Sequence, residues 1–355
     1  MKSLLKLLCE SKLPYTLRVL ITELFRFMRL PALNIPIKIA ISAGIVFLLL
    51  SRMELSDVSA QLAQVQVGGL FWGGVFILAQ IGLLAWRWAD LVNVDHQGPR
   101  MSYKESLKIT LASLLANVLF ITSISGLVVR IGLTVHHGIT LTKSICAAIT
   151  DRLMTLAALV IMAALFVPFL DRFVSTDLHN AAYATMVVLV FTFLVFIPLF
   201  YSRAVKDIIL STPKLEACAR YMLSLARDRG SFIRIVLNSL TAQAFYFVSV
   251  YFIALSAGVS FTFLDLMSVL PVITLVASLP VSFGGWGVRE GAFVYGLGLI
   301  GVPMETAFII SIEIGLLTML ATILAGVPAL LSMNLQKVSQ DIKNLLHKDK
   351  AFPQG

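Results

Sequence analysis

Long apolar runs, separated by short polar or basic connections, dominate the pattern of the chain. Most of these runs approach the roughly 20 residues that an α-helix needs to cross the hydrocarbon core of a bilayer. The runs are residues 35–51, 68–86, 109–129, 153–170, 181–201, 235–257, 266–288 and 306–331, with a shorter one at 291–304. Because backbone groups in lipid find no water to hydrogen-bond, the runs must form helices. The pattern therefore predicts an all-α, polytopic integral membrane protein.

The connections between the runs differ in their content of lysine and arginine, which favour the cytoplasmic side of a membrane. The basic regions are residues 1–34, 87–108, which begins with Arg87, 202–234, and the carboxyl tail from Lys337. The connections 52–67, 171–180 and 258–265 carry almost no basic residues and are expected to face outward. We therefore expect a multi-pass protein of the cell inner membrane with both termini in the cytoplasm.

The same pattern divides the chain into three parts. Residues 1–34 form a basic, leucine-rich segment that lies on the membrane surface or as a cytosolic tail. Residues 35–333 form the transmembrane domain, with a cytoplasmic loop at 202–234, and residues 334–355 form a basic cytoplasmic tail.

Two of the apolar regions fit a full crossing poorly. Three runs lie between the basic connections 87–108 and 202–234, whereas a return to the same side requires an even number of crossings. The run 109–129 is the most polar of the three, so we expect it to form a re-entrant helical hairpin buried in protein. The region 266–304 fits either three crossings or one crossing and a hairpin. Its prolines and glycines favour the hairpin.

These two regions share a pattern of residues. Serine, glycine and arginine recur at the same offsets, as Ser123, Gly126 and Arg130 in the first region and Ser282, Gly285 and Arg289 in the second. A glycine and then an acidic residue follow in each, namely Gly138 and Asp151, and Gly301 and Glu313. Chance could produce such a match in segments rich in serine and glycine. If the hairpins enter from opposite sides, however, they form an inverted repeat, which in transporters places the substrate site near the midplane.

Composition and charge narrow the class of protein further. Hydrophobic residues make up 58% of the chain and charged residues 13%, and the mean hydropathy is +0.91, which excludes a soluble domain. The net charge is +9, but the basic residues that produce it lie between the apolar runs, where they set the orientation of the protein in the membrane. This pattern does not indicate nucleic-acid binding. The three cysteines, Cys9, Cys146 and Cys218, imply no disulfide framework.

Six ionisable residues lie in or beside apolar helices, where each would cost about 2.5 to 3.5 kcal/mol at the bilayer centre. They are Arg130, Asp151, Arg152, Arg289, Glu290 and Glu313. Such residues either hold a helix bundle together as ion pairs or form a substrate site. In the second interpretation, Arg130 and Arg289 hold a lipid phosphate in a cationic midplane cavity, and the acidic residues tune or exchange it.

Small polar residues could complete this site. Asn117, Ser123 and Ser282 could donate or accept hydrogen bonds, although ordinary contacts between helices explain them as well. Gly284 and Gly285 would let the backbone approach a headgroup closely. The adjacent His136 and His137 lack the partners of a metal site, and no cofactor motif is present.

The segment Leu-Pro-Val-Ser-Phe-Gly-Gly-Trp-Gly-Val-Arg-Glu-Gly-Ala-Phe at 279–293, with Gly301, Pro303 and the helix of Glu313, resembles the signature of a known family. This is the lysylphosphatidylglycerol synthase transmembrane region, or flippase-like, family. An earlier set of residues is similar to the second signature of the family, namely Asn117, Ser123, Gly126, Arg130, Asp151 and Arg152. This chain departs from that signature at Leu127 and Val129. The resemblance covers most of residues 35–333.

The resemblance implies a domain that binds and moves lipids, here without a soluble synthase domain. The leading hypothesis is therefore a lipid transporter that is not an enzyme. A membrane-embedded transferase and a non-catalytic partner of an envelope-lipid enzyme are the alternatives. The expected partners are a membrane lipid and either a second copy of the chain or an envelope-biosynthesis enzyme.

Overall fold

A computed structural model describes residues 35–53, 65–94, 99–120, 123–175, 183–184, 213–259, 261–278 and 286–333. Within these ranges the chain is helical and forms no strand, which confirms the predicted all-α fold. The helices are α3 (Ile35–Leu50), α5 (Val67–Val92), α6 (Tyr103–Phe120), α7 (Ser123–His136), α8 (Leu141–Phe166), the 3-10 helix η2 (Val167–Arg172), α11 (Pro213–Arg227), α12 (Arg229–Ser256), α13 (Phe263–Ala277), α14 (Val288–Gly298) and α15 (Met304–Leu331).

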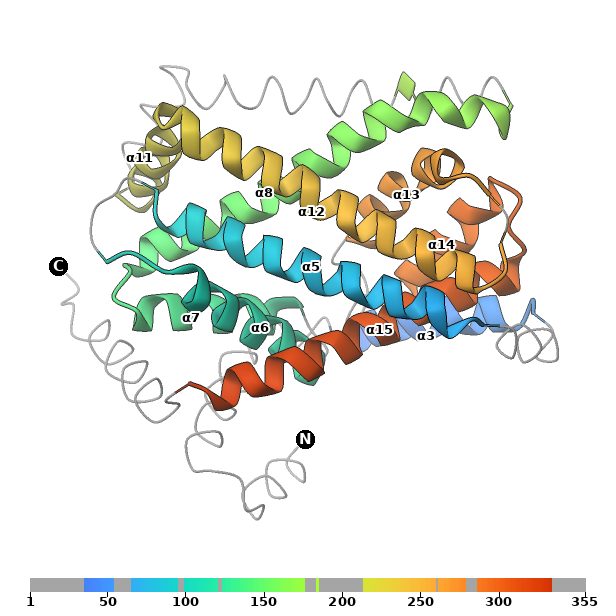
Figure 1. The fold of residues 1–355 in the computed structure, drawn as a ribbon, viewed down its shortest axis with the longest axis horizontal. Helices are drawn as coiled ribbons and strands as arrows, with labels where there is room; N and C mark the ends of the chain where they lie inside the picture. The colour runs from blue at the N-terminus through green and yellow to red at the C-terminus, as the bar shows by residue number, and fades with distance from the viewer. Residues whose placement is uncertain are drawn as a thin grey trace, which may run out of the picture.

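Two successive sets of four helices share one order of lengths, long, short, short and long. The helices α5, α6, α7 and α8 contain 26, 18, 14 and 26 residues, and α12, α13, α14 and α15 contain 28, 15, 11 and 28. In Figure 1, α5 and α12 lie side by side and run in opposite directions. Helices α8 and α15 also run in opposite directions but are not in contact along their length. The helix order and directions match the inverted repeat expected from the sequence.

The short helices form the two hairpins, which lie at opposite ends of the bundle (Figure 1). Each hairpin packs against the last helix of the other set, since α6 contacts α15 and α13 contacts α8. A twofold axis between α5 and α12 would produce these two equivalent contacts. Among the described residues, only α5, α8 with η2, α12 and α15 are long and apolar enough to cross a membrane, and the hairpin helices are not.

The turn of the first hairpin is held by polar residues of the run 109–129. The backbone N–H of Gly126 donates to Asn117 Oδ1 at 2.7 Å, and Ser125 Oγ donates to the Ala116 carbonyl at 3.0 Å. A Cβ at position 126 would collide with the carbonyl of Ser113, so α6 and α7 can approach this closely only at a glycine. The predicted break in the run is therefore confirmed, with longer arms than expected.

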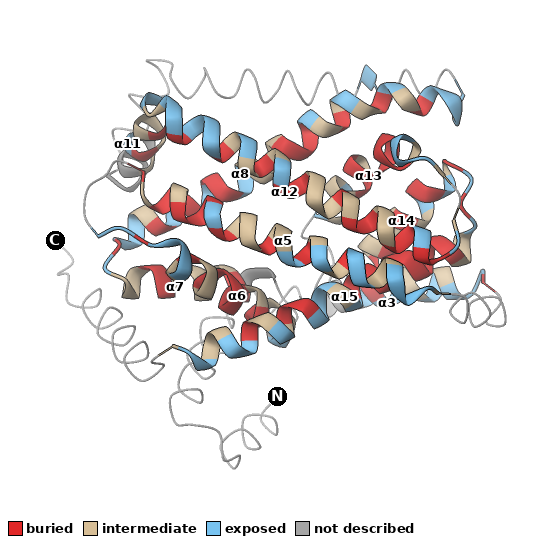
Figure 2. Cartoon of the chain, in the orientation of Figure 1, coloured by how far each residue is buried: buried red, intermediate tan, exposed pale blue. Residues whose placement is uncertain are grey.

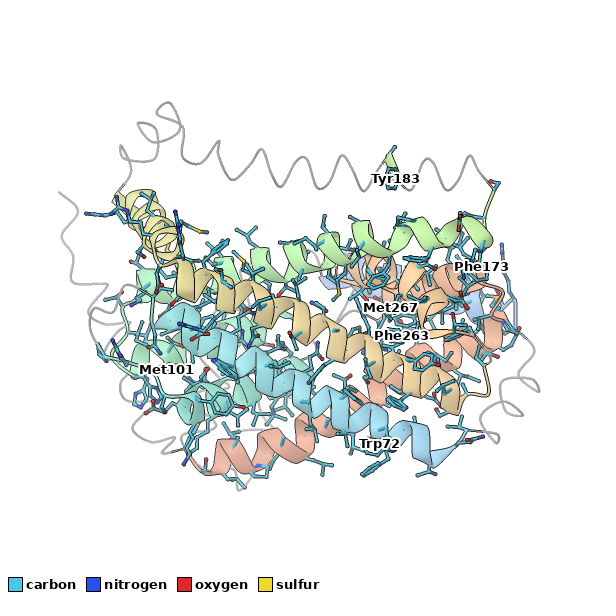
Figure 3. The ribbon with its side chains drawn as sticks, turned by 45° about the horizontal axis from the view of Figure 1, so that its top comes forward. Trp72, Met101, Phe173, Tyr183, Phe263 and Met267 are labelled. Carbon is cyan, nitrogen blue, oxygen red and sulfur yellow. A yellow bond between two sulfur atoms is a disulfide. The ribbon has the colours of Figure 1, made fainter. Side chains whose placement is uncertain are left out.

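Exposed apolar residues cover the outside of the bundle, and buried residues gather between the helices (Figure 2). Trp72, for example, lies on the outer face of α5 and is 51% exposed (Figure 3). Such an apolar outer surface suits lipid contact, and a soluble protein would not expose it over a large area. Inside, one core cluster joins α12, α13, α14 and α15 with residues of α8 and η2, and another joins α5, α6, α7 and α8 with residues of α11 and α12.

Some helix boundaries differ from the sequence prediction. Helix α8 begins at Leu141, well before residue 153, and includes Asp151 and Arg152. The Thr140 side chain caps its start by accepting a hydrogen bond from the Lys143 N–H. Helix α5 continues to Val92, which brings Arg87 into the bundle. The run 181–201 lies outside the described residues, apart from two positions.

The expectation of no disulfide is wrong. Cys146 of α8 and Cys218 of α11 form one, with an S–S distance of 2.06 Å, and Cys146 is buried. Local sequence could not show this pair, because 72 residues separate its members and only the packing of α11 on α8 brings them together. The bond lies in a segment predicted to face the cytoplasm, where disulfides are rare.

Candidate functional site

The first candidate site is a cluster of one carboxylate and two arginines inside the first set of helices. Asp151 of α8 accepts from Arg87 Nε at 2.8 Å through one oxygen, and from Arg130 Nη1 at 3.1 Å through the other. The three residues come from three different helices, α8, α5 and α7. With two cations and one anion, the cluster carries an excess positive charge.

The two arginines of this cluster differ in how many bonds they make. Arg87 is 2% exposed and uses all three guanidinium nitrogens, because it also donates to Ser239 Oγ at 3.1 Å and Thr155 Oγ1 at 2.8 Å. The guanidinium of Arg130 makes one hydrogen bond among the described residues, to Asp151, and lies 4.9 Å from the ring centre of Trp88. Arg87 is thus fixed on every side, whereas Arg130 keeps free donors.

The second candidate site lies at the start of α14. Arg289 Nε and Nη2 both donate to Glu290 Oε1, at 3.1 and 2.6 Å, while Glu290 Oε2 accepts from the backbone N–H of Gly287. The guanidinium of Arg289 lies 4.7 Å from the ring centre of Trp286. It also lies directly against α15, where a Cβ at Gly315 would collide with it. Glu290 is fully buried, so its carboxylate is paired inside the protein.

Both sites place an arginine over a tryptophan ring, a similarity that the matching offsets of Ser, Gly and Arg did not predict. They differ in the origin of the carboxylate. Arg130 reaches across to Asp151 on another helix, whereas Arg289 pairs with its own neighbour, Glu290. The first site therefore ties helices together, and the second is a neutral pair within one helix.

The remaining predicted residues are dispersed. Glu313 of α15 is buried apart from both arginines, and its Oε2 atom has no hydrogen-bond partner among the described residues. Arg152 is exposed on α8 and forms no ion pair within the described part of the chain, so the structure does not bring it into the cluster. Asn117 holds the hairpin turn through Gly126. The side chain of Ser123, like all of Ser282, Gly284 and Gly285, lies outside the described residues.

Sequence reasoning missed Arg87 and Trp88, because the apolar run appeared to end at residue 86. Continued apolar residues at Ala89, Leu91 and Val92 are the signal that the helix extends past the arginine. A charge followed by another apolar helical turn is typical of a buried ionisable group in a membrane helix.

A hollow of about 580 Å³ lies between α3 and α14. Its walls are apolar residues such as Ile45, Leu49, Val294 and Leu299, and Arg52 is its only charged lining residue. The volume falls within the roughly 300 to 1,000 Å³ of small-molecule sites. Among the described residues, no group of three or more histidine, cysteine or acidic side chains could hold a metal ion.

The family model of the lysylphosphatidylglycerol synthase transmembrane region matches residues 35–326. The chain belongs to this family. A search of curated proteins found no match. The matched range contains both hairpins and both arginine sites, and it begins with α3 and ends within α15. The family assignment expected from the segment 279–293 is therefore confirmed.

Proposed function

We propose that the protein binds an anionic lipid, or a phosphate-bearing lipid-linked intermediate, and moves it across the inner membrane. The observation that carries this proposal is the presence of one buried arginine site in each half of an inverted repeat. In transporters built from inverted repeats, substrate sites lie where broken helices of the two halves meet. We therefore assign the two hairpins to substrate handling and no enzymatic role to the domain.

The free donors of Arg130 support a phosphate as the group recognised. Its planar guanidinium carries five N–H donors, and among the described residues only Asp151 accepts from them. Bidentate recognition of phosphate is the strongest use of such donors in a site with little water. The excess positive charge of the Arg87, Arg130 and Asp151 cluster would be balanced by one negative headgroup.

The hollow between α3 and α14 supports a lipid as the larger ligand. Its lining is apolar, which suits acyl chains, while Arg52 at one end could meet a headgroup. The hollow also reaches Gly291, two residues after Arg289, so the second arginine site lies near it in the chain.

A reconstituted transport assay tests the proposal. The purified protein is placed in liposomes that contain fluorescently labelled phosphatidylglycerol, and the loss of signal to a quencher added outside reports the exchange of lipid between leaflets. We expect Arg130→Gln and Arg289→Ala to abolish protein-dependent exchange. The matched control is Arg100→Gln, which changes an exposed arginine in the connection before α6 and should leave exchange unchanged.

Native mass spectrometry of the same variants provides an independent readout. If the wild type retains one anionic lipid class and the two arginine variants lose it, lipid binding at these arginines is supported. Bound lipids that mirror the membrane in every variant, together with unchanged exchange, would show that the arginines only hold the helices together.

A further inference from the structure

The last long helix of each set carries an acidic residue in its third turn. Asp151 is the eleventh residue of α8 and Glu313 is the tenth of α15, counted from Leu141 and Met304. At a rise of 1.5 Å per residue, both lie about 15 Å from the start of their helix. The two carboxyl groups are thus counterparts in the inverted repeat.

Their surroundings differ completely. Asp151 accepts from two arginines, one through each oxygen. Glu313 is 8% exposed, and its buried Oε2 atom has no hydrogen-bond partner among the described residues. Two acids at matching depths therefore have opposite electrostatic environments.

The repeat also shows which cations the second half lacks. Arg87 is the twenty-first residue of α5, and the twenty-first residue of α12 is Ser249. The Ser249 hydroxyl donates to the Gly73 carbonyl of α5, whereas Arg87 donates to Ser239 of α12 and to Asp151. At the position of the fixed arginine, the second half therefore has a hydroxyl that donates to a backbone carbonyl.

The counterpart of Arg130 is present, but its charge is used elsewhere. Arg289 donates twice to Glu290, where the first half has Ile131 after its arginine. Arg289 lies on the Gly315 side of α15, and residues 313 and 315 point roughly 200° apart around a helix. Glu313 instead lies one helical turn before Leu317, on the same side of α15, and Leu317 lies against Gly73 and Gly74 of α5. The arginine and the acid are thus on different sides of α15.

No other charged side chain compensates for Glu313 within the described residues. The helices that pack on α15 are α5, α6, α12 and α14. Their ionisable residues are Arg87 and Asp90 on α5, Tyr103, Lys104, Glu105 and Lys108 on α6, Arg229, Arg234, Tyr246 and Tyr251 on α12, and Arg289, Glu290 and Tyr295 on α14. Among the described pairs, the ion pairs of these helices join Arg87 with Asp151, Arg234 with Asp90 and Arg289 with Glu290, and Glu313 is in none of them.

An ionised carboxylate in an apolar interior is strongly disfavoured unless a cation or several donors compensate for it. We infer that Glu313 is a proton-binding site: its carboxyl group is protonated in this state and exchanges that proton with water during the working cycle. The O–H bond of the carboxyl group is the only bond that breaks and re-forms, and water accepts and supplies the proton. Resting on the proposed function, we assign to this site the coupling of lipid movement to protons.

Labelling with dicyclohexylcarbodiimide tests the proton site without any transport assay. This apolar reagent modifies protonated carboxyl groups in membranes, and peptide mass spectrometry locates the product. In protein held in lipid nanodiscs, we expect modification at Glu313 that falls as the pH is raised, and little at the ion-paired Glu290 and Asp151. If the reagent does not modify Glu313 at any pH, the proton site is overturned.

Transport measurements then test the coupling. With a pH difference across the liposome membrane, the wild type should move labelled phosphatidylglycerol faster in one direction, and Glu313→Gln should remove this dependence. The control is Glu305→Gln, at the first turn of α15, which should retain it. A sodium gradient that drives movement in place of the pH gradient would overturn the assignment of a proton.

The two failures can be distinguished. If Glu313 is modified in a pH-dependent way but no variant affects lipid exchange, the proton site stands and the proposed lipid transport fails. If exchange depends on Arg130 and Arg289 but not on the pH gradient or on Glu313, lipid transport stands and the coupling fails.

Discussion

Replacement of Arg87 by methionine should destabilise the protein more than any single change at an exposed charge. The substitution keeps an unbranched, apolar side chain of similar length but removes three hydrogen bonds, to Asp151, Ser239 and Thr155. Ser239 and Thr155 keep their own donor bonds to the backbone of the preceding turn, so they are not left as unsatisfied donors. The main loss is the ion pair with Asp151.

The expected magnitude follows from the remaining partner of Asp151. Removal of one member of a buried ion pair typically costs about 3 to 5 kcal/mol, because a charge is left uncompensated. Here Arg130 stays 3.1 Å from the second oxygen of Asp151, so the cost should lie at the lower end, about 3 kcal/mol. Asp151→Asn leaves the buried Arg87 and the partly buried Arg130 without an anion and should cost more, about 4 to 5 kcal/mol.

A double-mutant cycle isolates the interaction between the two residues. The combined Arg87→Met and Asp151→Asn variant should be more stable than the sum of the single effects predicts, by about 2 kcal/mol. The free energy of unfolding is measured in mixed micelles by titration with a denaturing detergent, with tryptophan fluorescence as the signal. Arg152→Met, next to Asp151 but exposed, is the control and should change stability by less than about 0.5 kcal/mol.

The reasoning fails if Arg87→Met unfolds with the same free energy as the wild type and the cycle gives no coupling. That result would mean that water or lipid headgroups already solvate Arg87 and Asp151, so that the pair contributes nothing beyond what each gains alone.

Three further predictions concern packing, covalent structure and pH. Gly126→Ala should cost about 1 to 3 kcal/mol of unfolding free energy, because its Cβ would collide with α6, whereas Gly298→Ala, with open space around it, should not destabilise. Peptide mapping without reducing agent should recover the peptide of Cys218 linked to α8, and Cys218→Ser should cost roughly 4 kcal/mol by chain entropy. Two free thiols in that map would refute the bond. The backbone N–H of Ser102 donates to the carboxylate of Glu105, which lowers the pKa of Glu105. This stabilisation is present above the unfolded pKa of about 4.3 and is lost as the pH falls through the lower folded pKa. The acid limb of a stability profile should therefore become shallower in Glu105→Gln.

The hairpins and the repeat were largely predictable because their signals are local. Small and polar residues at the turn of the first hairpin, and the matching offsets of Arg130 and Arg289, depend on spacing within a few helical turns. The lengths of the helices in the two sets follow from the same repeat. Local signals of this kind survive without knowledge of the tertiary structure.

The composition of the candidate sites was predictable only in part, because partners came from distant segments. Arg130 and Asp151 were both candidate site residues, but their direct ion pair was not predicted. Arg87 lies 64 positions before Asp151 and looked like the start of a loop. The pairing of Arg289 with its neighbour Glu290 follows a rotamer choice that spacing does not reveal. The disulfide between Cys146 and Cys218 depends on where α11 packs, which the hydrophobic pattern leaves open.

The two halves of the repeat differ in rigidity as well as in charge. In the first half, Asp151 links α5, α7 and α8 through Arg87 and Arg130, and the disulfide adds α11, so these helices are fixed to one another. In the second half, Arg289 satisfies Glu290 within α14 and makes no ion pair to α15 among the described residues. A hairpin that carries its own counter-ion can shift along α15 without leaving a buried charge unpaired, which would be costly in an apolar interior. If one hairpin moves during lipid transport, we therefore expect it to be α13 and α14, with the first half as the frame against which they move.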